Sequence, residues 1–184
     1  MHPHLARLSA ALTAVDPETP KIYAWGYKLA AVLSGGGRLL ACGNGGSAAE
    51  AQHLTAELVG RYRVAGRRPY AAIPLHADTS SLTAIGNDFG MAELYARQVR
   101  AHGRPGDVLL CLSTSGTSRN VTEAAEAGRE CGLTTWALTG PGPNRLAELC
   151  DEALTVPAGD TATIQEVHLT VIHMLCDVIE KAVA

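Results

Sequence analysis

The chain has 184 residues, of which 47% are hydrophobic and 18% charged, and its formal net charge is −3 at pH 7. These values suit one globular domain with a sizeable core, and they exclude the strongly basic face typical of nucleic-acid binding. The N-terminus lacks a basic segment followed by an apolar core, and no apolar run approaches the roughly 20 residues of a membrane span. We therefore expect a cytoplasmic protein with neither a nucleic-acid nor a membrane partner.

The chain begins with two predicted helices. Apolar residues recur at helical spacing over residues 4–15 and 18–34, and Gly35-Gly36-Gly37 ends the second helix. These helices could pack on each other, on a sheet or on a second subunit. We expect residues 1–34 to take part in oligomer packing.

A glycine-rich turn follows the first predicted strand. The apolar residues 39–42 lead into Gly43–Ser47, and a glycine-free amphipathic segment follows at residues 48–58. The glycines let a ligand approach the main chain, and the start of the next helix offers free N–H groups and a positive dipole end. A phosphate fits such a site, although a plain loop between a strand and a helix can have the same pattern.

His53 and Glu57 lie four residues apart on this predicted helix, so they share one face. Together they could hold a metal or supply a base. An ordinary polar helix surface would give the same spacing. The helix is followed by a basic loop, which we interpret as a solvated loop or a sugar-phosphate contact; its arginines are Arg61, Arg63, Arg67 and Arg68.

Strands and helices alternate along the rest of the chain. This alternation predicts one open parallel sheet of about five strands that is covered on both faces, with ligands bound outside the carboxyl ends of the strands. The predicted elements are a strand at 70–75, a short helix at 80–85 ending at Gly86–Gly90, a helix at 91–101, a strand at 107–112, a helix at 118–130, a strand at 134–138, a short helix at 144–150, a strand at 153–156 and a long helix at 163–182.

A second polar loop follows the clearest buried strand. It has five hydroxyl side chains in six residues, Ser113-Thr114-Ser115-Gly116-Thr117-Ser118. Neutral donors together with a helix N-terminus are what a phosphate monoester needs. Helix capping would explain one or two of these hydroxyls, so the number of them favours phosphate binding.

The last predicted helix carries Gln165, Glu166, His168 and His173 among apolar residues. Any one of them could be a capping or interface group. Gln165 and His173 would lie about 12 Å apart along the helix, which stretches both side chains if they serve one small site. The strain is removed if Gln165 precedes the regular helix or if two subunits contribute, and we favour a site at a subunit interface.

The five cysteines are scattered in apolar surroundings without CxxC spacing. This pattern predicts buried free thiols, with neither disulfides nor zinc knuckles. They are Cys42, Cys111, Cys131, Cys150 and Cys176.

Together these segments resemble the phosphoheptose isomerases of the sugar isomerase (SIS) domain superfamily. The similarity spans essentially the whole chain, in order. The segments that carry it are Cys42–Ser47, Ala56–Arg63, Gly86–Gly90, Leu112–Gly116 and Ile164–His173.

The resemblance implies a single SIS domain over residues 1–184, an α/β fold in which an αβα sandwich surrounds a five-stranded parallel sheet with flanking N- and C-terminal helices. It also implies a homotetramer with inter-subunit active sites. The implied activity is aldose–ketose isomerisation of the phosphosugar D-sedoheptulose 7-phosphate to D-glycero-D-manno-heptose 7-phosphate, in heptose precursor biosynthesis.

The resemblance also implies roles for individual residues. Glu57 and His173 would be the acid/base pair. The phosphate would be held by Ser113, Thr114, Ser115 and Ser118. Further substrate contacts would come from Asn44, Gly45, Gly46, Ser47, Glu57, Asn87, Asp88 and Gln165. One zinc per subunit would be bound by His53, Glu57, Gln165 and His173.

Two positions depart from the family pattern. Thr117 stands before Ser118 where the family usually has Ser-Gly-Asn-Ser, and Ala162-Thr163 replaces a common Asp-Arg pair. The first exchange keeps a hydroxyl near the phosphate. The second removes a sugar contact, which leaves the exact substrate preference open.

Two other functions compete with the isomerase. One is a non-catalytic tetrameric SIS interaction protein of the replication-initiator-associating type, which the segments Leu82–Ile85 and Tyr95–Arg100 resemble. Glu57 and His173 discriminate, because a binding module does not need this pair. The other is a phosphosugar-sensing regulator, for whose DNA-binding domain we expect no room in 184 residues.

Overall fold

Five parallel strands form the centre of the computed structural model, which describes residues 1–183. Their order in the sheet is β2-β1-β3-β4-β5, and every neighbouring pair is parallel. The five-stranded parallel sheet predicted from the sequence is therefore confirmed. The strands are β1 (Leu39–Cys42), β2 (Ala72–Pro74), β3 (Val108–Ser113), β4 (Thr134–Thr139) and β5 (Glu152–Thr155).

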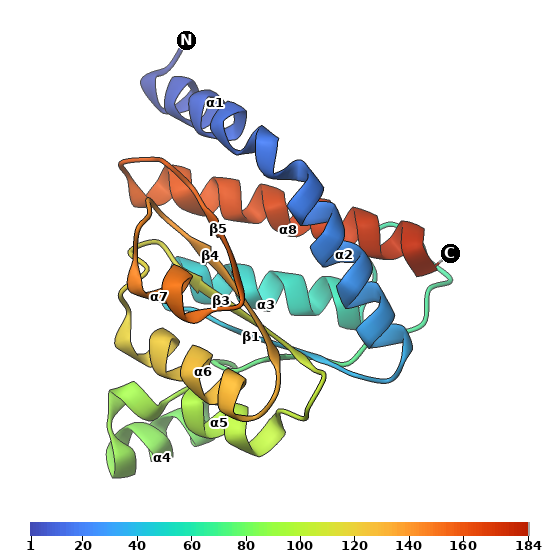
Figure 1. The fold of residues 1–184 in the computed structure, drawn as a ribbon, viewed down its shortest axis with the longest axis vertical. Coiled ribbons are helices and arrows are strands. Elements are labelled where there is room, and N and C mark those ends of the chain that lie inside the picture. Colours follow the sequence, from blue (N-terminus) through green and yellow to red (C-terminus); the bar gives the residue numbers. More distant parts are fainter. Residues whose placement is uncertain (184) are drawn as a thin grey trace.

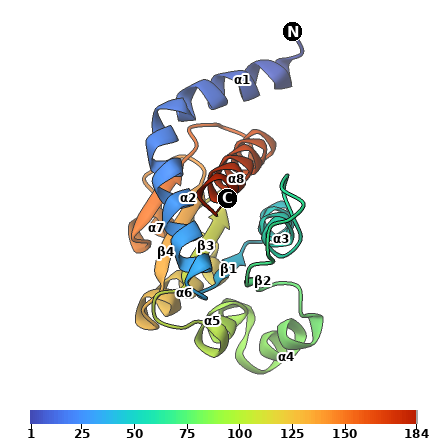
Figure 2. The same ribbon diagram turned by 90° about the vertical axis from the view of Figure 1, so that its right-hand side faces the viewer.

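Helices cover both faces of the sheet, so the αβα sandwich is confirmed as well (Figure 1). One face is covered by α1 (Pro3–Val15), α2 (Thr19–Ser34), α3 (Gly46–Val59) and α8 (Thr161–Val183). The other is covered by α4 (Thr79–Phe89), α5 (Ala96–His102), α6 (Arg119–Glu130) and α7 (Arg145–Leu149). The turn η1 (Asp16–Glu18) joins α1 to α2, and η2 (Met91–Glu93) lies between α4 and α5. Figure 2 shows α1 projecting beyond the sheet, at the end of the molecule opposite α4.

The two cores arise because successive strand side chains point to opposite faces. Leu110 of β3 packs in the core beneath α2 and α8, whereas its neighbours Leu109 and Cys111 pack in the core beneath α5 and α6. In the first core, the rings of Trp25 and Trp136 stack with centroids 4.8 Å apart. This stack fixes α2 to β4 and holds the first face of the sandwich in place.

The α4 region differs from its prediction. The helix was expected to end at Gly86, but it continues to Phe89 and ends at Gly90, whose φ is +87°. One glycine inside a helix costs only about 1 kcal/mol relative to alanine, and Leu82 and Ile85 pack against the second core. The predicted helix at 91–101 is divided into η2 and α5.

All five cysteines are free, as predicted. Four are buried, and Cys131 is half-buried. Cys42 Sγ donates to Cys111 Sγ at 3.8 Å. Hydrogen bonding to Cys150 and Cys42, together with burial, raises the pKa of the Cys111 thiol well above its ordinary value. Cys42, Cys111 and Cys150 lie in the second core and Cys176 in the first, and thiols buried in apolar surroundings are not poised to react.

Helix α8 is the one helix among residues 1–183 that is long and apolar enough, by length and composition, to cross a membrane. Of its most apolar stretch, 56% is buried inside the protein. The sequence analysis expected no apolar run to approach the length of a membrane span, and α8 corrects that expectation. The apolar stripe is explained by packing of α8 against α2 and α3.

Candidate active site

The two polar loops meet at the carboxyl ends of the neighbouring strands β1 and β3. Between them lies a cavity of about 320 Å³, which also reaches the first turns of α8. The structure thus brings together most residues expected to bind the phosphosugar. The cavity is lined by Asn44, Gly45, Gly46, Ser47, Leu112, Ser113, Thr114, Ser118, Thr161 and Gln165.

The hydroxyl loop is shaped by its own hydrogen bonds. Ser113 Oγ donates to Ser118 Oγ at 3.1 Å and lies 3.4 Å from Ser115 Oγ, and the N–H of Gly116 donates to Ser113 Oγ at 3.2 Å. Ser118 is the N-cap residue of α6, but its side chain makes no capping hydrogen bond. The start of α6 therefore presents N–H groups and the positive end of its dipole to the cavity, which suits an anion.

Gly116 and Asn144 hold this loop against α7. Gly116 has a φ of +65°, and a side chain there would collide with Asn144. Asn144 Oδ1 accepts from the N–H of Ala147 at 3.0 Å, and its Nδ2 donates to Thr139 Oγ1 at 3.0 Å. The loop is thus prearranged by the fold, which lowers the entropic cost of binding a phosphate.

We expect Ser118→Ala to weaken substrate binding more than turnover. Hydrogen bonds to charged groups contribute about 1.5–3 kcal/mol, so KM should rise by about 10- to 100-fold. Thr122→Ala is the control, because the Thr122 hydroxyl donates to the Arg119 carbonyl of the same helix at 2.9 Å. Steady-state kinetics check this, and equal KM values for the two variants would contradict the phosphate role of Ser118.

Asn44 is held by two residues that the sequence analysis missed. Its side-chain amide exchanges two hydrogen bonds with Asn120, at 2.9 and 2.8 Å. The Tyr95 hydroxyl donates to the Gly43 carbonyl at 2.7 Å and to Asn44 Oδ1 at 3.1 Å. Burial, with a smaller contribution from Cys42, raises the pKa of Tyr95 to about 12, so the phenol remains a donor. No local pattern marks these partners, which lie 76 and 51 residues from Asn44.

A second cavity, of about 290 Å³, lies further along the groove between α3 and α8. It is lined by Ala49, Glu50, His53, Leu169 and His173. His53 Nε2 lies 2.9 Å from His173 Nε2 and 3.7 Å from Glu57 Oε1. His53 therefore lies next to both predicted acid/base residues, His173 and Glu57, and all three are predicted zinc ligands.

The surroundings of His173 favour its neutral form. Partial burial lowers the pKa of His173, His53 and Arg63 lower it further, and the Glu57 carboxylate opposes them. The Tyr62 ring stacks against the His173 ring with centroids 5.7 Å apart. A neutral imidazole can both accept and donate a proton at neutral pH, which suits a proton shuttle.

Gln165 lies in the first cavity and not beside His173. Its amide packs against Gly46, where a Cβ would collide with it. Helix α8 begins at Thr161, so the idea that Gln165 precedes the regular helix is wrong. Gln165 and His173 therefore stay about 12 Å apart along the axis, one in each cavity of the same groove.

Asn87 and Asp88 lie outside both cavities of this chain. Both are exposed at the end of α4, and Asn87 Nδ2 donates to Asp88 Oδ1 at 2.7 Å. The structure does not bring them to the other predicted substrate contacts. Ser115, predicted to hold the phosphate, is exposed and does not line the first cavity, and its Oγ accepts hydrogen bonds from the N–H and the hydroxyl of Thr117.

The replaced Ala162-Thr163 pair lies at the start of α8. Thr163 is buried, and its N–H and hydroxyl both bind the Asp160 carboxylate, at 3.0 and 2.9 Å. The Thr163 hydroxyl is therefore used in capping α8 and does not replace a sugar contact. Thr161, two residues earlier, lines the first cavity.

The donor set beside His173 suits zinc in its chemistry. Two imidazole Nε2 atoms face each other and a carboxylate lies next to them, and zinc is commonly bound by these groups. Among residues 1–183, however, no three His, Cys, Asp or Glu side chains form a ready-made metal cluster.

Glu50 is a further residue of the candidate active site that the sequence analysis missed. It lines the second cavity, and its Oε2 lies 3.8 Å from Nδ1 of the fully buried His168. Neither atom has a hydrogen-bond partner among the described residues. His168 Nε2 faces the Thr139 carbonyl at 3.2 Å, so this pair connects the groove to the end of β4.

The interpretation of the basic loop as a solvated loop is wrong for Arg67. Only 3% of its side chain is exposed, and it pairs with the buried Glu180. Arg63 is exposed and pairs with Asp177 at 2.8 Å. The four arginines therefore do not form one solvated cluster.

Comparisons with known proteins show which proteins this chain is similar to. The SIS domain family model matches residues 4–140. A phosphoheptose isomerase of Streptomyces coelicolor is 59% identical over 97% of this chain and 77% of its own length. The structure of phosphoheptose isomerase GmhA from Neisseria gonorrhoeae matches with a TM-score of 0.88 at 42% identity, covering 97% of this chain and 95% of that one. A phosphoheptose isomerase structure from Francisella tularensis matches with a TM-score of 0.84 at 36% identity, covering 92% of each chain. The chain therefore belongs to the phosphoheptose isomerase family of SIS-domain proteins.

Proposed function

We propose that this protein is an aldose–ketose isomerase that converts D-sedoheptulose 7-phosphate into D-glycero-D-manno-heptose 7-phosphate. The observation that carries the proposal is the groove between α3 and α8, with a phosphate-type cavity at one end and Glu57, His53 and His173 at the other. The substrate has the same arrangement, because its phosphate and its reacting carbons lie at opposite ends. A non-catalytic interaction protein would not need this acid/base pair and is not favoured.

The reaction moves one proton between neighbouring carbons through an enediol. Glu57 removes a proton from C1 of the ketose and returns one to C2, and this transfer changes no oxidation state of the protein. His173 takes the proton of the C1 hydroxyl and delivers a proton to the oxygen on C2. A carboxylate suits the first role and a neutral imidazole the second. Ser113, Thr114, Ser115 and Ser118 hold the phosphate meanwhile.

Product analysis with two substrates tests this proposal. We expect sedoheptulose 7-phosphate to be converted to the aldose, and fructose 6-phosphate to be converted much more slowly. The second substrate matters because the Asp-Arg pair usual in the family is replaced here by Ala162-Thr163. Efficient conversion of fructose 6-phosphate alone would overturn the assignment of the substrate.

We also propose that zinc binds beside the acid/base pair. His53, Glu57 and His173 would hold the ion, and Gln165 would have to reach them along the groove. When bound, zinc supplies a Lewis acid that polarises a carbonyl oxygen. As a zinc ligand, Glu57 would be a weaker base, so the ion and the proton transfer compete for the same carboxylate.

Removal of the metal tests the zinc proposal. Lewis-acid stabilisation of several kcal/mol corresponds to a loss of at least about 100-fold in kcat on chelation. Added zinc should restore the rate, and His53→Ala should lower the zinc content of the purified protein measured by mass spectrometry. Full activity in metal-free protein would contradict a catalytic role of zinc.

A homotetramer with active sites shared between subunits completes the proposal. Exposed apolar side chains lie along the first two helices, Leu5 and Leu12 on α1 and Tyr23 and Tyr27 on α2. Asn87 and Asp88, which lie outside the cavities of their own chain, would reach substrate bound to a second copy. Light scattering on the purified protein measures the mass, and a monomer with full activity would contradict a shared site.

A further inference from the structure

The C-terminal end of α3, the helix that carries Glu57, is closed by a buried arginine from the loop that follows. We infer that Arg67 and Glu180 form a clamp that positions Glu57 and, through Tyr62, His173. The inference rests on the proposed function, in which those two residues transfer the protons. Arg67 and Glu180 line neither cavity of the groove, so they are positioning residues and not catalytic ones.

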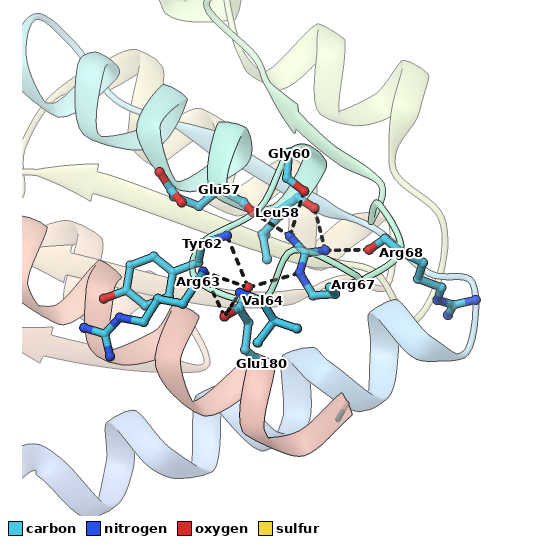
Figure 3. A network of polar contacts seen from close by, with 9 residues as sticks. All are labelled: Glu57, Leu58, Gly60, Tyr62, Arg63, Val64, Arg67, Arg68 and Glu180. Atoms are coloured by element: carbon cyan, nitrogen blue, oxygen red, sulfur yellow. Dashed lines mark hydrogen bonds and ion pairs between the residues drawn. The ribbon is translucent and has the colours of Figure 1, made fainter.

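All five N–H groups of the Arg67 guanidinium have an acceptor (Figure 3). Nη2 donates to the carbonyls of Glu57 at 2.6 Å and Gly60 at 3.2 Å. Nη1 donates to the carbonyls of Leu58 at 3.0 Å and Arg68 at 2.6 Å. The last carbonyls of a helix have no partner within it, and the rigid guanidinium fork satisfies several of them at once. One of these carbonyls belongs to Glu57 itself.

Glu180 of α8 completes the clamp from the other side. Its carboxylate accepts from Arg67 Nε at 3.4 Å and from the consecutive N–H groups of Tyr62, Arg63 and Val64 at 3.0 to 3.2 Å (Figure 3). Glu180 is buried, with 7% of the residue exposed. The carboxylate therefore fixes the loop after α3 onto the same helix that carries His173.

Tyr62 connects the clamp to the second proton-transfer residue. Its N–H donates to Glu180, and its ring stacks on the His173 ring with an angle of 23° between the planes. Glu180 lies seven residues after His173, which is two turns of α8 and places both on the same face. The clamp thus joins the backbone of Glu57 to the ring of His173. Small errors in such a geometry cost large factors in rate.

Arg68 provides a matched control in the next position of the chain. Its Nη2 donates to the carbonyls of Leu33 at 3.3 Å and Ser34 at 2.8 Å, at the C-terminal end of α2. Both arginines also lie over the Tyr70 ring. Arg68 therefore has the same chemistry, but it closes a helix that carries none of the proposed site residues.

The test compares Arg67→Lys, Arg68→Lys and Glu180→Gln by kcat, KM and thermal unfolding. Lysine keeps the charge but has a single donor centre, so Arg67→Lys should lower kcat by about 10- to 100-fold and leave KM within about twofold. Arg68→Lys should keep kcat within about twofold of the wild type. Glu180→Gln should lower kcat as Arg67→Lys does, and the double variant should lose less than the product of the two single losses.

The clamp would be overturned by a folded Arg67→Lys protein with wild-type kcat, by an equal loss of kcat in Arg68→Lys, or by a rise in KM with kcat unchanged. If Arg67→Lys does not fold at the assay temperature, Glu180→Gln decides by the same criteria. The NMR signals of the His53 and His173 rings give a second readout that needs no turnover. An inactive wild type would defeat the proposed function, whereas unchanged ring signals in Arg67→Lys would defeat the clamp.

Discussion

Glu57→Gln should lower kcat for sedoheptulose 7-phosphate by about 100- to 10,000-fold, the contribution usual for a general base. Glutamine keeps the shape of the side chain but cannot accept the proton from C1. KM should change little, because the proposed phosphate site is the other cavity of the groove. Glu57 is partly buried, with 20% of its side chain exposed, and its Oε1 lies 3.7 Å from His53 Nε2. Glutamine has nearly the same size as glutamate, so the variant should keep the packing around this position.

Glu123→Gln is the control for this substitution. Glu123 lies on α6 in a surface pair with Arg119 at 3.5 Å, and the loss of its charge should leave kcat unchanged. Stopped-time assays of aldose formation, with thermal unfolding to confirm the fold, measure both variants. Near wild-type turnover by folded Glu57→Gln would remove Glu57 from the mechanism.

His173→Asn should also lower product formation by about 100-fold or more, because asparagine cannot carry a proton between the two oxygens. Removal of the proton from C1 is assigned to Glu57, which this substitution leaves in place. Exchange of the C1 proton with solvent should therefore fall less than product formation does. In Glu57→Gln, by contrast, both should fall together.

His102→Asn serves as the control for the histidine. His102 is exposed at the end of α5, so its replacement should change neither exchange nor product formation. Proton NMR follows both quantities in one sample. A His173→Asn protein that loses exchange and product to the same extent would contradict the separation of the two roles.

Local signals in the sequence were sufficient to predict the two polar loops that line the first cavity. Gly43–Ser47 and Ser113–Ser118 each follow a buried strand, and the carboxyl ends of parallel strands meet at one edge of the sheet. The pairing of His53 with Glu57 was also predicted from a local signal, because residues four apart lie on one face of a helix. The fold class also followed from alternation of strand and helix, which fixes the layers.

Partners far apart in the sequence could not be found in this way. Tyr95 reaches Gly43 across 52 residues, and Arg67 reaches Glu180 across 113. Nothing local distinguishes Arg67 from Arg68, since both are arginines in one loop beside Tyr70. Only tertiary packing buries the first against Glu180, and the same packing decides that Gln165 and His173 lie in different cavities.

The experiment that tests the central claim most directly is the reaction with sedoheptulose 7-phosphate in deuterated buffer, followed by NMR. Proton transfer through an enediol predicts that the aldose product carries deuterium at C2, because the base exchanges its proton with solvent before returning it. A protein that binds the phosphosugar but gives neither product nor exchange would contradict the isomerase and would favour a binding module. Product formed without deuterium at C2 would contradict a base that exchanges its proton with solvent before returning it.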